Sequence, residues 1–163
     1  MNNSLQEYLK FANKLADVAG ITSMEYFRTS LSIDNKSDES PVTIADKNTE
    51  LKIRSMIEKK YPNHGILGEE FDSINPEAEF VWVIDPIDGT RSYIAGHKDF
   101  GNLISLTQNK KPIIGIINCP AHNERWVGVK NLNSTINQKL AKSSNVTNIE
   151  DAYLFTSGLY FDE

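Results

Sequence analysis

The sequence predicts an α+β domain in which two helices pack on an antiparallel sheet. Two segments near the N-terminus have the hydrophobic period of amphipathic helices, and short runs rich in β-forming residues follow them. Helices followed by a run of strands, without regular alternation, are typical of α+β folds. A chain of 163 residues is long enough for one domain with a sizeable core.

The first helix is predicted over residues 5–28. Its apolar residues recur three and four positions apart, while charged and amide residues fall on the opposite side. Gly20 weakens this helical pattern, but Met24 and Phe27 continue the same apolar face. Residues 30–41 are mostly polar and predict a turn or a short hairpin.

The second helix is predicted to begin after Thr43. Asp46 follows three residues later, so the two residues can cap the start of the helix. The buried side of this helix is expected to consist of Leu51, Ile53, Met56 and Ile57. The turn-forming residues 62–65 end it.

The sheet is predicted from runs of β-forming residues that are each bounded by turn residues. These runs are residues 66–67, 80–84, 103–107, 113–117 and 125–129. Residues 109–112 are suited to a hairpin connection between the third and fourth runs. Trp82 and Trp126 lie within these runs, and we expect both in the core.

The C-terminal residues predict one more strand, over 152–156. Apolar residues so close to the end of the chain, with no partner after them, suggest that it stops inside a larger fold. We therefore expect an N-terminal α+β part over residues 1–145 and the start of a second part over residues 146–163.

Composition argues against several classes of protein. The formal charge of −5 argues against a nucleic-acid binder and against a basic membrane-surface protein. The single cysteine, Cys119, cannot form an internal disulfide or a multi-thiolate zinc site. No apolar run is long enough to cross a bilayer, and the first residues lack the features of a signal peptide. We expect a cytoplasmic protein with neither nucleic acid nor membrane as a partner.

Side chains for other common chemistries are missing or scattered. His64, His97 and His122 are far apart in the sequence and lack compact zinc-binding spacing, so each is expected on the surface or in a turn. Cys119 is expected to be a small buried residue. The sequence contains no nucleophile elbow, Walker loop or dinucleotide-binding glycine pattern.

The segment Asp85-Pro86-Ile87-Asp88-Gly89-Thr90 carries the clearest chemical signal. An apolar run delivers Asp85 to its end, and a stiff turn can bring Asp88 towards the same point. If Gly89 and Thr90 open a short helix, its free N–H groups make a seat for an anion. Carboxylates beside a phosphate seat describe a Mg²⁺-dependent phosphoryl-transfer site. A surface turn whose carboxylates cap N–H groups explains the same spacing.

Other acidic and basic residues have ordinary explanations when each is taken alone. Glu69 and Glu70 are adjacent on an extended segment, so only one of them can face a given site. A solvated loop explains both. Capping of the second helix explains Asp46, and an exposed position in the polar loop explains Lys36.

Three motifs, in this order, resemble the inositol monophosphatase family. They are Thr-Ile-Ala-Asp at 43–46, Gly-Glu-Glu at 68–70 and Trp-Val-Ile-Asp-Pro-Ile-Asp-Gly-Thr at 82–90. The resemblance covers essentially the whole chain, and residues 88–96 and 124–128 look most like the histidinol-phosphate phosphatase branch. It implies the first part of that family's αβαβα sandwich, truncated before the second α/β half.

The resemblance also implies a role for each matching residue and a Mg²⁺ cofactor. The implied metal-binding residues are Glu69, Asp85, Ile87 (through its carbonyl), Asp88 and Glu70. The implied catalytic residues, which act on the attacking water or support it, are Glu69, Thr90 and Asp46. The implied substrate-binding residues are Asp88, Gly89, Thr90 and Lys36.

The implied activity is hydrolysis of a small phosphorylated metabolite, with histidinol phosphate as the first candidate and an inositol phosphate as the second. The family's second half carries a Trp-Asp motif with a further metal ligand, and this chain lacks it. We therefore expect the chain alone to bind Mg²⁺ weakly and to show little or no turnover. A non-catalytic module that keeps the fold is the alternative of another class. The resemblance is compatible with a homodimer.

Overall fold

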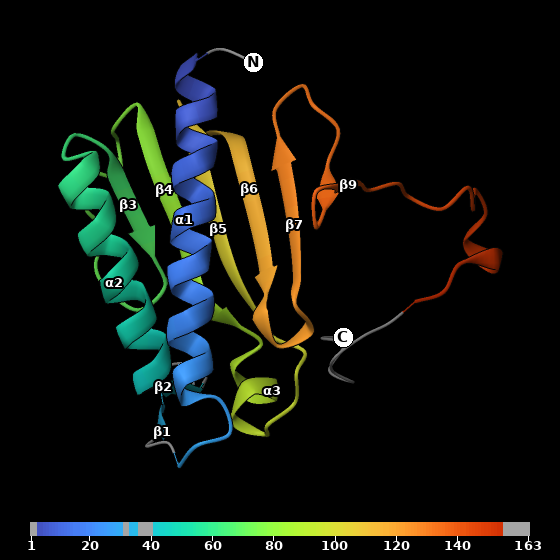
Figure 1. The fold of residues 1–163 in the computed structure, drawn as a ribbon, viewed down its shortest axis with the longest axis horizontal. Coiled ribbons are helices and arrows are strands. Elements are labelled where there is room, and N and C mark those ends of the chain that lie inside the picture. The colour runs from blue at the N-terminus through green and yellow to red at the C-terminus, as the bar shows by residue number, and fades with distance from the viewer. Residues whose placement is uncertain (1–2, 31–32, 36–40, 155–163) are drawn as a thin grey trace, which may run out of the picture.

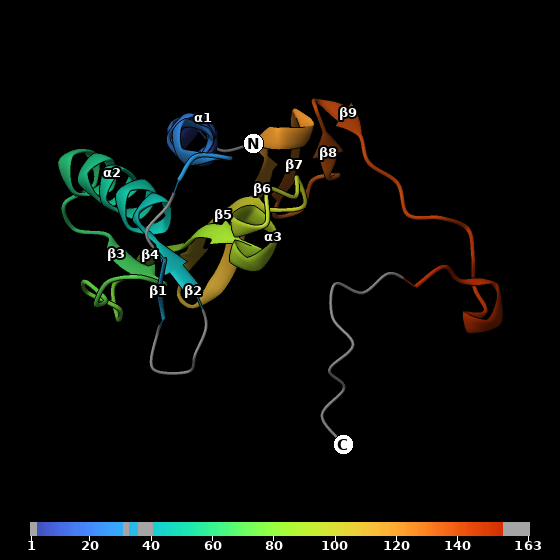
Figure 2. The ribbon, with the colours of Figure 1, turned by 90° about the horizontal axis from the view of Figure 1, so that it is seen from below.

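The computed structural model describes residues 3–30, 33–35 and 41–154. In these residues a seven-stranded sheet has the order β3-β4-β5-β6-β7-β8-β9. The helices α1 (Asn3–Tyr26) and α2 (Ile44–Lys60) lie side by side on one face of it, as Figures 1 and 2 show. This arrangement confirms the predicted α+β class.

The strands of the sheet pair antiparallel except at one edge. There β3 runs parallel to β4, and every later neighbour is antiparallel. The strands are β3 (Gly65–Gly68), β4 (Phe80–Asp88), β5 (Gly101–Gln108), β6 (Lys111–Cys119), β7 (Glu124–Val129), β8 (Thr135–Ile136) and β9 (Lys139–Leu140). A short helix, α3 (Thr90–Ile94), follows β4, and 3₁₀ turns occupy Pro120–His122 and Ile149–Asp151.

The first helix ends two residues before its predicted end. Arg28 has a φ of 61°, a left-handed conformation that does not continue an α-helix. Met24 is 39% exposed and Phe27 lies beyond the helix, so the predicted extension of the buried face was wrong. The predicted hairpin after it is present as the pair β1 (Ile33–Asn35) and β2 (Pro41–Thr43), while residues 36–40 lie outside the described residues.

The second helix begins as predicted, but its buried face differs. Thr43 is the N-cap, and a capping box with Asp46 is formed. Leu51 is 48% exposed, which corrects the prediction. Its expected place on the buried face is taken by Glu50 and Arg54, a buried ion pair. Ile53 and Ile57 are buried as expected.

The sheet is wider than predicted at its second edge. No sequence pattern predicted β8 and β9, which are two residues each and are joined by Asn137 and Gln138. Both joining residues have positive φ, as tight hairpin turns require. Trp82 is fully buried, but Trp126 is 39% exposed because it faces the side of the sheet that no described helix covers. The prediction of a core position for Trp126 was wrong.

The segment after β9 runs away from the sheet (Figure 1). Ala152, Tyr153 and Leu154 form no strand, and Tyr153 is 91% exposed. The strand predicted over 152–156 is therefore wrong for its described residues, while 155 and 156 lie outside them. The boundary at residue 145 stays a prediction. No described helix has the length and apolar character that a membrane span requires.

The core lies between the two helices and the sheet. It contains aromatic and aliphatic side chains from both layers, such as Leu15, Ile53, Trp82 and Ile104. Gly20 lets α1 approach the sheet closely, because a Cβ there would lie 2.8 Å from the Asn118 amide nitrogen. That amide is itself fixed, since it donates to the Ala16 carbonyl at 3.2 Å. Close packing thus explains a glycine in the middle of a helix.

We expect Gly20→Ala to lower the melting temperature. Alanine favours an isolated helix by about 1 kcal/mol over glycine, but overpacking against a fixed group costs about 1–3 kcal/mol. Gly115→Ala is the control, because its Cβ would have nothing within 4 Å. A rise in melting temperature for Gly20→Ala would contradict this account.

Candidate active site

The site is built where β4 ends. Asp85 pairs with Leu103 and Asp88 pairs with Gly101, so two residues of β4 lie opposite one residue of β5. This bulge bends the strand and sets the two carboxylate residues at its two ends. The turn was predicted to follow a strand ending near Ile84, whereas the strand continues through Asp88.

Gly89 directs the chain from the strand into α3. Its φ is 86°, and a Cβ there would lie 2.9 Å from the Asp99 carbonyl oxygen, so only glycine fits without strain. The short helix predicted to open at Gly89 and Thr90 is present, and the Tyr93 N–H donates to the Gly89 carbonyl. The predicted anion seat at this turn stays a prediction.

Asp85 is the most perturbed carboxyl group of the site. Burial, then the charges of Glu69 and Asp88, raise the pKa of Asp85 from 3.8 to about 8. A hydrogen bond between the Asp85 and Glu69 side chains contributes, and it requires one of the two to hold a proton. The Oδ1 atom of Asp85 is buried and has no hydrogen-bond partner among the described residues. A carboxylate oxygen in this position is suited to bind a divalent cation.

Thr90 and Asp46 are brought together from distant parts of the chain. The Thr90 hydroxyl lies 3.5 Å from Asp46 Oδ1 and 3.0 Å from the Ile87 carbonyl oxygen. Asp46 Oδ2 accepts from the Thr43 N–H and hydroxyl at 2.8 and 2.6 Å. Burial raises the pKa of Asp46, against the lowering effect of these bonds. Asp46 thus holds Thr90 as well as capping α2.

The loop with Glu69 and Glu70 is held by a buried ion pair that sequence reasoning missed. Glu50 accepts from Arg54 Nε at 2.7 Å and from the Glu70 N–H at 2.8 Å. Arg54 also donates to the Phe71 carbonyl at 2.8 Å. Glu69 itself is exposed and acts on Asp85, whereas the backbone of Glu70 is tied to α2. The i, i+4 spacing of Glu50 and Arg54 is a signal for pairing, but not for burial.

The predicted metal ligands do not form a closed set. Among the described residues, no group of three His, Cys, Asp or Glu side chains is arranged to hold a metal ion. What fits a cation is the buried, unpartnered Asp85 oxygen with carboxylates near it. Lys36, predicted to contact substrate, lies outside the described residues.

Two of the histidines come together, although their sequence positions predicted no cluster. His122 Nε2 lies 2.9 Å from Asp99 Oδ1, and His97 Nδ1 lies 3.6 Å from Asp99 Oδ2. His64 is half-buried and accepts from the Trp82 indole N–H at 3.2 Å. Cys119 is half-buried, and burial raises the pKa of its thiol, which disfavours a nucleophilic thiolate.

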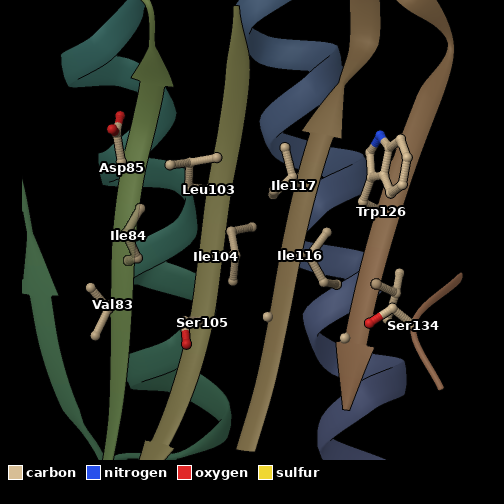
Figure 3. Close-up of a pocket in the computed structure, with 13 residues that line it drawn as sticks. Val83, Ile84, Asp85, Leu103, Ile104, Ser105, Ile116, Ile117, Trp126 and Ser134 are labelled. Carbon is tan, nitrogen blue, oxygen red and sulfur yellow. The ribbon is translucent and has the colours of Figure 1, made fainter. Parts of the chain in front are cut away.

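An apolar depression of about 590 Å³ adjoins the site on the open face of the sheet. Figure 3 shows Asp85 at one end of it, with Ile117 and Trp126 on the far strands. Its lining includes Val83, which is 37% exposed, and Ile117, which is 48% exposed. Asp85 therefore stands at the border between a polar turn and an apolar surface.

Comparison with known proteins places these features in a family. Residues 4–160 match the sequence profile of the inositol monophosphatase family. A histidinol-phosphatase from Chlorobaculum parvum is 44% identical over 119 residues, which are 72% of this chain and 46% of that protein. The chain spans about half the length of the curated relatives it matches.

Solved structures share the fold. An inositol monophosphatase from Zymomonas mobilis is 42% identical with a TM-score of 0.76, over 90% of this chain and 56% of that one. An IMPase/NADP phosphatase, whose structure holds Mg²⁺ and phosphate, has a TM-score of 0.80 over 92% of this chain and 58% of that one. Its identity of 20% shows a likeness in fold alone.

We expect Asp85→Asn to stabilise the metal-free protein increasingly as pH rises. The folded protein holds a proton on Asp85 up to about pH 8, whereas the unfolded chain releases it near pH 3.8. Folding stability therefore falls between these two pH values, and asparagine removes this loss.

Melting temperatures in EDTA at pH 5 and pH 8 test this prediction. The variant should melt at least about 2 °C above the wild type at pH 8, and the gap should shrink at pH 5. Asp72→Asn, at an exposed position, is the control. A gap that does not change with pH would count against a protonated Asp85.

We expect Glu50→Gln to destabilise the protein by about 3 kcal/mol, because it leaves the buried Arg54 cation without its partner. Glu58→Gln, at an exposed position of the same helix, should change the free energy of unfolding by less than about 0.5 kcal/mol. Urea unfolding of both variants provides the measurement. Equal stabilities of the two variants would show that the buried Glu50–Arg54 ion pair does not stabilise the fold.

Proposed function

The chain belongs to the inositol monophosphatase family, and from this membership we propose that it carries the metal- and phosphate-binding residues of a Mg²⁺-dependent phosphomonoesterase. The observation that carries the proposal is the Asp85 carboxyl group. It has a buried oxygen without a hydrogen-bond partner in the described part of the chain, and burial, followed by the charges of Glu69 and Asp88, raises its pKa. Such a cluster is stable with all groups ionised only when a cation neutralises it.

The proposed metal ligands are the side chains of Glu69, Asp85 and Asp88 and the carbonyl of Ile87. Glu70 would support a further ion. When bound, Mg²⁺ would polarise the phosphoryl group, lower the pKa of a coordinated water and stabilise the leaving oxygen. Gly89 and Thr90 would lie against the phosphate with Asp88, and Lys36 would add a positive charge near it.

Thr90 and Asp46 would prepare the attacking water together with Glu69. When the Thr90 hydroxyl donates towards Asp46 Oδ1, 3.5 Å away, its lone pairs are free to accept a hydrogen bond from the attacking water. Asp46 stays in place because the N-cap residue Thr43 donates twice to its other oxygen. Attack by this water requires no covalent intermediate on the protein.

The proposed substrate is histidinol phosphate, in keeping with the 44% identity to a histidinol-phosphatase. An inositol phosphate is the second candidate, favoured by the 42% identity to an inositol monophosphatase of known structure. A location in the cytoplasm and a homodimeric state stay predictions.

Cation binding and phosphate release test the proposal. In calorimetric titrations we expect Asp85→Asn to weaken Mg²⁺ binding at least 10-fold, since it removes a charged ligand. Little phosphate release is expected from these 163 residues, and what there is should require Mg²⁺, be faster from histidinol phosphate than from inositol 1-phosphate, and be lost in Thr90→Val. Glu58→Gln should leave both measurements unchanged.

The possible outcomes separate the alternatives. Mg²⁺ binding that is independent of Asp85 would contradict the proposal. Binding that depends on Asp85, with the little Mg²⁺-dependent phosphate release that is expected of this chain, would support the proposal. Binding that depends on Asp85 with no phosphate release at all, even at saturating Mg²⁺, would support the cation site but favour a non-catalytic module. Full activity of these 163 residues, lost in Asp85→Asn, would confirm the site and refute the expectation of little turnover.

A further inference from the structure

The bulge in β4 leaves one backbone group that the sheet cannot satisfy. Pro86 and Ile87 lie between the paired residues Asp85 and Asp88, opposite the single residue Asn102. Pro86 has no N–H, and its carbonyl falls where the regular pattern of hydrogen bonds is interrupted. A buried carbonyl without a partner destabilises the folded protein, so this position needs a donor.

The side chain of Asn102 supplies that donor. Asn102 is fully buried, and its Nδ2 donates to the Pro86 carbonyl at 2.7 Å. The same nitrogen donates to the Ser23 hydroxyl of α1 at 3.3 Å. The amide therefore spans from the centre of the bulge to the helix that covers the sheet.

Asn118 fixes the direction in which the Asn102 amide points. Asn118 Nδ2 donates to Asn102 Oδ1 at 2.9 Å, so the opposite end of the Asn102 amide must carry its N–H groups towards Pro86. Arg125 Nε donates to Asn118 Oδ1 at 2.9 Å and fixes that amide in turn. Arg125 is anchored on α1 by Asp17, whose Oδ1 lies 2.7 Å from its Nη2.

The result is a continuous chain of hydrogen bonds from the surface of α1 to the turn between two carboxylates. If the hydrogen-bonded pair Asn102 and Asn118 served stability alone, it could lie anywhere in the core. This pair ends on the only residue of the bulge that has no N–H of its own, between Asp85 and Asp88. Arg125, which links Asp17 of α1 to Asn118, lies on β7, three strands away from β4.

We propose that Asn102 is a positioning residue that sets the spacing of Asp85 and Asp88 by holding the Pro86 carbonyl, with Asn118 and Arg125 orienting its amide. The role rests on the proposed function of the turn as a cation site. It requires no contact between Asn102 and the cation. Loss of the amide should loosen the turn before any cation binds.

Two measurements on the metal-free and Mn²⁺-titrated protein test this role. Asn102→Leu keeps the side-chain volume and removes the donors. Leu106→Ala, a fully buried position on the same strand, is the control that costs stability without contacting the turn. We expect Asn102→Leu to bind Mn²⁺ about 10-fold more weakly and to exchange the amide protons of Ile87 and Asp88 about 10-fold faster. Leu106→Ala should change both by less than about 2-fold after correction for global stability.

If Asn102→Leu does not fold, Asn118→Ala provides the test. It leaves the hydrogen bond from Asn102 to Pro86 and removes the group that orients the Asn102 amide, together with the Asn118 bonds to Ala16 and Arg125, so its global stability is corrected for in the same way. It should weaken Mn²⁺ binding and speed the same amide exchange by about 3-fold. Either variant with exchange and Mn²⁺ affinity equal to Leu106→Ala would overturn the positioning role. If Asp85→Asn binds Mn²⁺ as tightly as the wild type, the proposed function fails, and amide exchange still decides whether Asn102 holds the turn.

Discussion

Two residues of β4 face a single residue of β5, and the position of the candidate site depends on this mismatch. A regular ladder would place Asp85 and Asp88 on opposite faces of the sheet, because side chains alternate along a strand. The bulge breaks the alternation, so both carboxylates can act on one another. Gly89 then turns the chain sharply enough for the Thr90 hydroxyl to reach the Ile87 carbonyl within the bulge.

Hydrogen bonds from buried polar groups hold the acidic residues at this point. Asp46 is held by Thr43, and the Glu69 loop is held by the Glu50–Arg54 pair. Bringing carboxyl groups together in a buried place has an electrostatic cost. This cost is seen at Asp85, whose pKa is raised. A protein that needed only stability would gain by losing this group. The arrangement is therefore understandable as a site that awaits a cation.

Local patterns in the sequence predicted most of the fold and the nearness of Asp85 and Asp88, whereas the roles of the site residues stay predictions. The capping residues Thr43 and Asp46 are a short-range signal and were found where expected. The Asp-Pro-Ile-Asp segment was predicted as a turn, but it continues β4 through a bulge, and the chain turns only at Gly89. Burial of Glu50 and Arg54 was missed because a charged pair at helical spacing is usually exposed. The exposure of Trp126 depends on which face of the sheet is covered, which no local pattern reveals. The contact between Asn102 and Asn118 depends on strand register in the same way.

We infer that the β4 bulge presents Asp85 to a divalent cation in a geometry that exists before the cation binds. An anomalous difference map from crystals soaked in Mn²⁺ provides the test. We expect a peak beside Asp85 Oδ1, with the Pro86–Asn102 hydrogen bond unchanged from the metal-free crystal. A peak elsewhere, or a rebuilt turn with that bond broken, would contradict it.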